Sequence, residues 1–312
     1  MKKIKSIILV ILLCALLTAG FSSCLISKIK FVSDGELIYE VVVTIDGMNC
    51  DAPVAPEKPG YTFICWKSST AIERAGTNIS ILKSDTFYAV WEKSEIITEE
   101  PNGLFYRKID GGYEIAAYLG WASSLTLPSD YNGEKLISID KEAFLGSQLR
   151  EIILPETITH IGESAFRRSR LLNIIIPDGV TKIADETFQF CYLLQSVFLP
   201  DGLTEIGSRA FGHCVSLWSI TIPDGVTKIA DETFRYCTEL RQITLPKGLT
   251  EIGAYAFREC TSADSIDIPY GVYIKKRAFE MWKSNQTIYI HGKSYGSIFR
   301  FSGCKAKRVL IK

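Results

Sequence analysis

Four cysteines at a constant spacing are the side chains whose chemistry needs to be considered first. They recur at intervals of 23 residues: Cys191, Cys214, Cys237 and Cys260. Thiolates bind zinc, but zinc sites usually take their ligands from short pairs such as Cys-x₂-Cys. Ser147 and Ser169 stand at equivalent positions, and an unreactive cysteine packs as a small apolar residue. We therefore predict a structural column of small residues here and no metal site.

No other group of residues suggests catalysis. The three histidines, His160, His213 and His291, have different places in the chain's repeat, and His213 precedes Cys214 directly, so the two side chains are expected to point different ways. The sequence has no Gly-x-Ser-x-Gly, no phosphate-binding loop and no His-Glu-x-x-His. Its 35 basic and 35 acidic residues leave no positive excess for nucleic acid. We expect neither an enzyme, nor a cofactor, nor a nucleic-acid partner.

The elements that position these residues are internal repeats. Prolines recur every 22 or 23 residues from Pro155 to Pro269, and phenylalanines do so from Phe144 to Phe279. The 13 residues Ile176–Phe188 are identical to Ile222–Phe234, so the duplicated unit is a pair of repeats of 46 residues. A period of this length predicts a solenoid.

One repeat shows the physical logic of the whole array. Ile220 and Ile222 read as a short strand that ends at Pro223, because proline lacks the N–H that a sheet needs. Pro223–Gly225 then has turn chemistry, and Asp231–Phe234 is predicted to be a short helical or 3₁₀ turn that places Phe234 in the core. A repeat this short buries its apolar faces only against its neighbours, so seven or so repeats must stack.

The consensus of the repeat resembles a known family. Leu199–Cys214 reads Leu-Pro-x-Gly-Leu-Thr-x-Ile-Gly-x-x-Ala-Phe-x-x-Cys, which is the signature of BspA-like leucine-rich repeats. The resemblance covers about 200 residues. It implies a solenoid of mostly β structure on a surface protein that adheres to host matrix or to other cells, or takes part in aggregation.

Both ends of the solenoid depart from the consensus and are predicted to be caps. Leu104–Thr126 reads as a hairpin with its turn at Asp110–Gly112. At the other end we expect a strand at Thr287–Ile290, a short helix at Tyr295–Phe301 and a last strand at Arg308–Ile311. Terminal repeats are expected to differ because one face meets water.

The N-terminus reads as a targeting signal over residues 1–24. Three lysines precede the apolar stretch Ile7–Leu17, which is the order of a secretory signal peptide. Phe21–Cys24 resembles a bacterial lipobox, and this resemblance implies lipidation of Cys24 and attachment to a membrane. Secretion after cleavage and an uncleaved membrane anchor are the alternatives.

Residues 25–93 read as a small domain of short strands. Lys58–Phe63, Trp66 and Asp85–Trp91 resemble the Listeria–Bacteroides repeat, which implies a β-grasp-like module of bacterial surface proteins. Its aromatic residues could form a ligand platform, but in a domain this small they are expected to fill the core. Cys50 and Cys65 could form a disulfide outside the cell. The acidic segment 94–103 is predicted to be a linker, and 104–312 the repeat domain.

Two columns of the repeat are predicted to lie at its surface. Five residues after each proline, lysine and glutamate alternate from Lys182 to Glu251, which suits ion pairs between neighbouring strands or a merely solvated face. Two residues before each proline, the side chains point opposite to the buried ones, so this column is either an exposed partner site or covered by the protein itself. The candidate partner-binding residues are Ile153, Ile175, Phe198, Thr221 and Thr244, with Trp218 nearby.

Together these features predict an exported, envelope-attached binding protein without catalytic activity. The expected partner is a protein or polymer on a host or neighbouring cell surface, and the expected contact with the membrane is the lipid at Cys24. The alternative is a structural envelope protein that associates with itself and has no foreign ligand. The sequence leaves open the ligand, the oligomeric state and the exposure of Phe198 and Trp218.

Overall fold

The computed structural model describes residues 26–33, 36–44, 49–51, 61–67, 72–73, 78–80, 85–93, 97–99, 102–292, 295–296 and 300–311. The predicted signal peptide, with Cys24, lies outside these residues, and so do the side chains of the Cys50–Cys65 pair. In the described part, no helix is long and apolar enough to cross a membrane.

The chain divides into two compact units, each described here by itself. The first holds most of the chain up to Val90, and the second continues from Trp91 to Lys312. Strands are found where the small domain was expected to have them, and five of them form a sheet in the order β2-β1-β7-β4-β5, with β1 antiparallel to β2 and parallel to β7. The resemblance to the Listeria–Bacteroides repeat stays a prediction. The strands are β1 (Ile26–Ser33), β2 (Glu36–Thr44), β3 (Asn49–Asp51), β4 (Tyr61–Lys67), β5 (Ile72–Glu73), β6 (Asn78–Ser80) and β7 (Asp85–Lys93).

The second unit begins with a small cap sheet. It has the order β12-β13-β10-β9-β8, and the predicted hairpin is confirmed as β9 paired with β10. Strand β8 lies within the segment predicted to be a linker and pairs with β9, so this part of the segment belongs to the cap. Arg107 on β9 forms ion pairs with Glu114 on β10 and with Asp140, and thereby ties the hairpin to the first repeat. The strands are β8 (Ile97–Glu99), β9 (Leu104–Ile109), β10 (Gly112–Tyr118), β12 (Asp130–Tyr131) and β13 (Glu134–Ile139).

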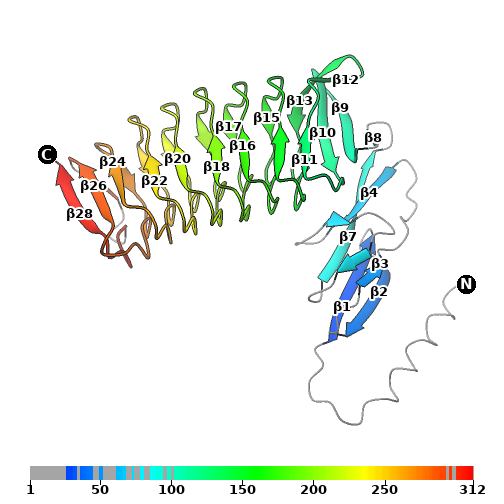
Figure 1. Ribbon diagram of the computed structural model, residues 1–312, viewed down its shortest axis with the longest axis horizontal. Coiled ribbons are helices and arrows are strands. Elements are labelled where there is room, and N and C mark those ends of the chain that lie inside the picture. Colours follow the sequence, from blue (N-terminus) through cyan, green and yellow to red (C-terminus); the bar gives the residue numbers. More distant parts are fainter. Residues whose placement is uncertain are drawn as a thin grey trace, which may run out of the picture. The chain divides into compact units, whose positions relative to one another are not determined.

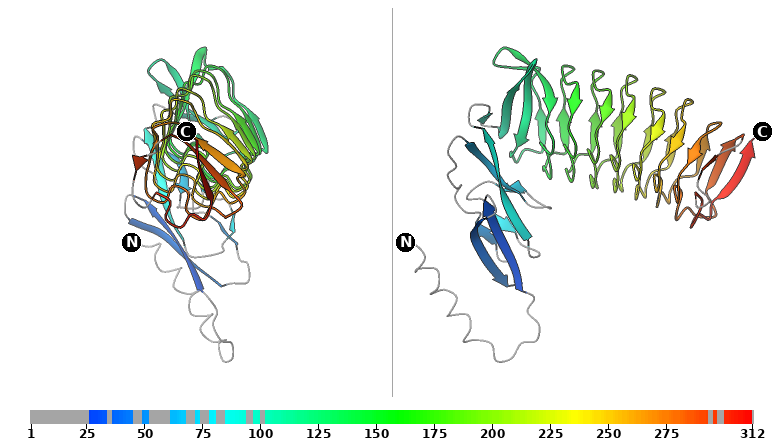
Figure 2. Two further views of the ribbon diagram at one scale, coloured as in Figure 1. Left: turned by 90° about the vertical axis from the view of Figure 1, so that its left-hand side faces the viewer. Right: turned by 180° about the vertical axis from the view of Figure 1, so that it is seen from behind.

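The predicted mostly β solenoid is confirmed, and each of its turns has two short strands. The strand that precedes the proline forms the first strand row, in which neighbouring repeats pair in parallel, as β16 does with β18 and β20 with β22. Figure 1 shows these turns side by side from green to red, and the left view of Figure 2 shows them superposed end-on. The first strand row consists of β11 (Ser124–Thr126), β14 (Glu151–Ile153), β16 (Asn173–Ile175), β18 (Ser196–Phe198), β20 (Ser219–Thr221), β22 (Gln242–Thr244), β24 (Ser265–Ile268), β26 (Thr287–His291) and β28 (Lys307–Ile311).

The second strand row follows the proline and continues from β13 of the cap. Its strands are also parallel, as in β13 with β15 and β21 with β23. In each member that contains an isoleucine, this residue points into the core while the residue before it faces outward or is half-buried. The members are β15 (His160–Ile161), β17 (Lys182–Ile183), β19 (Glu205–Ile206), β21 (Lys228–Ile229), β23 (Glu251–Ile252), β25 (Tyr273–Ile274) and β27 (Tyr295–Gly296).

A row of stacked phenylalanines fills the core between the strand rows. Their rings are fully buried, and adjacent rings lie nearly parallel with centroids 5.1 to 5.7 Å apart. This separation is close to the distance between paired strands, so each repeat adds one ring. The row consists of Phe144, Phe166, Phe188, Phe211, Phe234, Phe257 and Phe279.

The third side of each repeat, here called the turn row, corrects a prediction. Asp231–Phe234 was expected to begin a short helical or 3₁₀ turn, but residues 231–236 form non-helical turns in which Glu232 and Tyr236 have φ of 59° and 62°. Alternate N–H groups donate to the next repeat: Glu232 to the Ala254 carbonyl at 2.9 Å and Tyr236 to the Arg258 carbonyl at 2.8 Å. The backbone of this side thus bonds to its neighbour as a ladder, which a helix with its internal bonds could not do.

The C-terminal cap also differs from expectation in one element. The two predicted strands are confirmed as β26 and β28, but the predicted helix at Tyr295–Phe301 is wrong in its described residues. Tyr295 and Gly296 form β27, which pairs with β25, and Arg300 and Phe301 lie in a turn. The row of parallel strands therefore continues into the cap, and pairing with a neighbour overrides the local pattern.

Candidate binding surface

The cysteine column is structural, as its spacing predicts. Each thiol is buried and donates to a phenylalanine carbonyl of the preceding repeat, as Cys191 does to Phe166 at 3.0 Å and Cys214 to Phe188 at 3.1 Å. Burial raises the pKa of the Cys191 thiol to about 12, and it raises the pKa of Cys214 as well. A thiol that stays protonated is neither a nucleophile nor a ready metal ligand. Among the described residues, no group of His, Cys, Asp or Glu is arranged to hold a metal ion.

His213 takes part in a different arrangement on the turn row. Its ring lies between those of Phe190 and Tyr236, with centroid separations of 4.7 and 4.6 Å. Burial, and then the charge of Arg235, lower the pKa of His213. Cys214, the next residue, donates inward, so the two side chains diverge as predicted.

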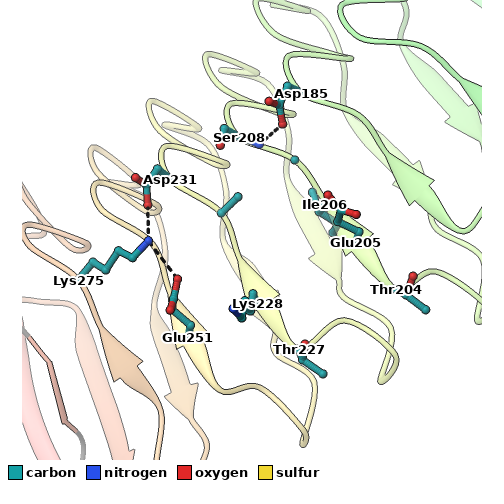
Figure 3. A pocket seen from close by; sticks show the side chains of 12 residues that line it. Asp185, Thr204, Glu205, Ile206, Ser208, Thr227, Lys228, Asp231, Glu251 and Lys275 are labelled. Atoms are coloured by element: carbon teal, nitrogen blue, oxygen red, sulfur yellow. Dashed lines mark hydrogen bonds and ion pairs between the residues drawn. The ribbon is translucent and has the colours of Figure 1, made fainter.

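The second strand row carries an ordered network of exposed charges. Lys182 bonds Glu205 at 2.8 Å across neighbouring strands, and Lys275 lies 3.0 Å from Glu251 and 3.3 Å from Asp231. Figure 3 shows Lys275 reaching both carboxylates, while the Asp185 carboxylate accepts the Ser208 N–H. Exposed pairs of this kind contribute about 0–1 kcal/mol each. Of the predicted cross-strand ion pairs, Lys182–Glu205 is formed, and exposed pairs of this kind favour register and solubility more than recognition.

The first strand row presents large apolar side chains to solvent. In each short strand the middle residue is buried or nearly so, and the two flanking residues point outward. The exposed fractions are 52% for Ile153, 68% for Ile175, 60% for Phe198 and 49% for Trp218. Thr221 and Thr244 are exposed in the same row. The sequence left open whether this column is covered, and in the described part of the chain it is not.

Backbone pairing places the candidate residues in two parallel lines. Ile175 is the register partner of Phe198, and Thr221 that of Thr244, so these residues form one line along the solenoid. Trp218 belongs to a second line, because its N–H donates to the carbonyl of Gln195 at 3.1 Å. This second line stands five residues before each proline and passes through Arg150, Leu172, Gln195, Trp218 and Arg241.

Between the two lines lies a floor of small polar side chains. Asn173 pairs with Ser196 in the strand register, and the Ser196 hydroxyl donates to the Asn173 side-chain oxygen at 2.6 Å. Ser219 holds the same position in the next repeat. Short side chains between longer ones make a groove that runs across the strands.

Part of this surface is a groove with a volume of about 640 Å³. Its lining includes Ile153, Ile175 and Phe198, so the structure brings three of the six candidate residues together. Trp218, Thr221 and Thr244 lie on the same side of later repeats but outside this groove. The groove also includes Arg150 and Glu156, which the sequence did not single out.

Two further exposed apolar residues were missed from the sequence. Tyr192 and Leu193 precede the strand of the same repeat as Phe198, and both are exposed. Comparison of the two copies of the duplicated unit could have found them, because the corresponding residues 46 positions later are the polar Thr238 and Glu239.

The duplication shows which faces of the solenoid its two copies share. The second strand row is unchanged, since Lys182 corresponds to Lys228 and Glu205 to Glu251. The first strand row differs, since Ile175 corresponds to Thr221 and Phe198 to Thr244. The apolar side chains of the Ile175–Phe198 line are therefore absent from the later copy, which keeps Trp218 on the second line, while the scaffold beneath both copies is the same.

Comparison with known proteins agrees with this architecture. A crystal structure of a leucine rich cell surface protein from Faecalibacterium prausnitzii is similar with a TM-score of 0.50 and 24% identity, covering 66% of this chain and 73% of that one. A leucine rich repeat protein of T. pallidum matches with a TM-score of 0.48 and 28% identity over 67% of this chain and 90% of that one. No curated protein matches in sequence. The model of the BspA type leucine rich repeat region matches residues 122–237 and 204–312 with six copies, and the chain belongs to this family.

Proposed function

We propose that this chain is a non-catalytic binding protein of the bacterial cell surface, which recognises a macromolecular partner through its first strand row. The observation that carries the proposal is the unbroken line Ile153, Ile175 and Phe198, all largely exposed in adjacent repeats. Contiguous exposed apolar side chains are unfavourable in water and mark interaction sites. Family membership and the N-terminal sequence support a surface location.

The make-up of the surface fits recognition of a partner. Large apolar side chains such as Phe198 and Trp218 stand beside small polar groups such as Ser196, which is the mixture found where a few buried anchors supply most of the binding energy. The thiols of the cysteine column are buried and protonated and cannot take part in chemistry at this surface.

The test uses two substitutions that the chain itself supplies. Ile175→Thr and Phe198→Thr copy Thr221 and Thr244, the exposed residues at the matching positions of the second copy, so they leave the scaffold intact. We expect the full chain to bind intact cells or extracellular matrix saturably, and the double variant to bind at least about tenfold more weakly. Lys228→Ala, exposed on the second strand row, is the matched control and should bind normally.

Two outcomes would contradict the proposal. Equal binding by the double variant and the parent would remove the first strand row as the site. Self-association that the double variant loses, without binding to any foreign surface, would favour a structural envelope protein. Analytical ultracentrifugation of parent and variant separates these cases.

Attachment to the envelope through a lipid on Cys24 is a further part of the proposal and rests on the sequence of residues 1–24. Mass spectrometry of the mature N-terminus should find a diacylated cysteine at position 24. An unmodified N-terminus would indicate secretion, and an intact Met1 an uncleaved anchor.

A further inference from the structure

A line of carboxylates begins at the groove of the first strand row and continues through the following repeats. The residue after each proline is acidic in four consecutive repeats: Glu156, Asp178, Asp201 and Asp224. All four are exposed, and within the described part of the chain none of them forms an ion pair. Glu156 itself lines the groove beside Ile153.

This acidic line runs parallel to the apolar line. Each carboxylate stands three residues after the outward-facing residue of its own repeat, as Asp178 does after Ile175 and Asp201 after Phe198. The stacking of this corner is seen where the Lys247 N–H donates to the Asp224 carboxylate of the preceding repeat at 3.3 Å. In that repeat the residue after the proline is Lys247 and its charge is positive. The acidic line therefore ends at Asp224, one repeat after the apolar line ends at Phe198.

The opposite wall of the groove is mixed in character. Its line of residues begins with Arg150 and continues with Leu172, Gln195 and Trp218, and Glu151 stands next to Arg150. Arg150 gives this wall a positive charge, and Glu151, which holds the floor position of its repeat, offsets that charge. The charge of the groove therefore comes from the acidic line, and it is of one sign.

The floor of the groove offers side chains but no free backbone. The Ile176 N–H donates to the Phe198 carbonyl at 3.0 Å and the Gln195 N–H to the Leu172 carbonyl at 2.8 Å, so the strands bond to each other along the row. A partner cannot add a strand here and must satisfy its own backbone hydrogen bonds. An α-helix does so by itself.

The spacing of the two lines also suits a helix. Adjacent strands are about 4.8 Å apart, and successive turns of a helix about 5.4 Å, so a helix along the solenoid axis sets one apolar residue per turn beside Ile153, Ile175 and Phe198. Lysine or arginine on the flank of that helix then meets Asp178 and Asp201 at the same spacing. Apolar anchors at helical intervals are the usual mode of helix recognition in a groove.

We propose that the groove binds a cationic amphipathic helix of a partner protein, with its apolar face on the line Ile153–Ile175–Phe198 and its basic flank on the acidic line Glu156–Asp178–Asp201–Asp224. This inference rests on the proposed function and specifies the chemistry of the partner. Attraction between the acidic line and a basic helix speeds association and selects against acidic helices.

A designed peptide tests the inference directly. The probe is a fluorescein-labelled helix of about 18 residues, long enough to be helical, built from leucine on one face and lysine elsewhere. Glutamate in place of lysine makes the first control peptide, and a scrambled order without an apolar face makes the second. Fluorescence anisotropy with the full chain should show saturable binding of the lysine peptide and at least about tenfold weaker binding of both controls.

Variants of the chain separate the two lines. Ile175→Thr with Phe198→Thr should weaken binding of the lysine peptide about tenfold or more, at any salt concentration. Asp178→Asn with Asp201→Asn should weaken it about three- to tenfold at low salt and flatten its salt dependence, because exposed ion pairs are screened. Lys228→Ala should change neither the affinity for the lysine peptide nor its salt dependence. Thermal unfolding followed by circular dichroism checks that the variants stay folded.

Three results would overturn the inference. They are equal binding of the glutamate peptide, equal binding of the scrambled peptide, and binding of a neutral polysaccharide that Phe198→Thr abolishes. If the lysine peptide does not bind but the threonine variants still lose cell or matrix binding, the cationic helix is refuted and the proposed function stands. If those variants lose nothing, the proposed function fails as well.

Discussion

Two single alanine variants of the same repeat should behave in opposite ways. Phe211→Ala should lower the stability of the fold, whereas Phe198→Ala should leave stability unchanged and weaken binding. The Phe211 ring is fully buried and stacks on Phe188 and Phe234 at centroid distances of 5.4 Å each. Removing a buried phenylalanine ring costs about 3–5 kcal/mol, because apolar contacts are lost and a cavity remains. Phe198 is 60% exposed, so its replacement should change the free energy of unfolding by no more than about 0.5 kcal/mol.

Urea denaturation followed by far-ultraviolet circular dichroism measures both effects. With an m-value of about 2–3 kcal/mol/M, Phe211→Ala should lower the midpoint by about 1–2 M. The transition should also broaden, because a weakened repeat in the middle of the array uncouples its two sides. Phe198→Ala should unfold like the parent and bind the partner more weakly.

Either of two results would refute this reasoning. A loss below about 1 kcal/mol for Phe211→Ala would mean that the ring row does not hold the repeats together. A loss for Phe198→Ala as large as that for Phe211→Ala would mean that the first strand row is covered in solution, and the binding surface would be withdrawn.

Three further predictions follow from individual contacts. Burial raises the pKa of the Cys214 thiol, so Cys214 should resist iodoacetamide at pH 8 until urea unfolds the chain. Rapid labelling of Cys214 in the folded protein would contradict its burial. Burial, with Arg235, lowers the pKa of His213, so the unfolded chain takes up a proton first as the pH falls below 6.5. The stability contributed by His213 is complete above that pH and is lost below it, and His213→Phe should flatten the fall in urea midpoint between pH 7 and pH 5; an unchanged slope would count against this. Lys182→Ala breaks the exposed 2.8 Å pair with Glu205 and should cost under about 1 kcal/mol, less in high salt, and a larger loss would show that this network carries stability.

The repeat and its core could be predicted because they depend on local pattern. The period of the prolines placed the ends of the strands, and the period of the phenylalanines placed the ring row, since each repeat must put the same apolar residues in the same place. The cysteine column followed from the same argument, and the structure adds the reason for its residue type. A thiol such as that of Cys214 is small enough for the core and donates to a carbonyl of the neighbouring repeat.

Two local structures were predicted wrongly because contacts between repeats decide them. Asp231–Phe234 has residues that suit a helical turn, but its backbone donates to the next repeat and Glu232 takes a positive φ. Tyr295–Phe301 departs from the consensus and was read as a helix, yet Tyr295 pairs with Tyr273 of the preceding repeat. In both cases hydrogen bonds to a neighbour, distant in sequence, outweigh local preference.

The sequence showed which column of the first strand row points outward, but not that this column is exposed. Alternation along a strand shows that Ile175 and Phe198 point away from the core, but it does not show whether another element covers them. The groove could not be predicted without the register between repeats. This register brings Glu156 beside Ile153 and leaves Trp218 on a separate line. Tyr192 and Leu193 were missed because they lie at a corner before the strand, where alternation does not apply.

The sequence by itself determined the period, the family and the buried residues. These depend on residue types that each repeat must keep in order to bury its faces. The tertiary structure decided which columns meet water and which lines run side by side, because both depend on register between repeats that are 22 or 23 residues apart. The phenylalanine row could be read along the chain, whereas the apolar and acidic lines become one surface only when the repeats are stacked.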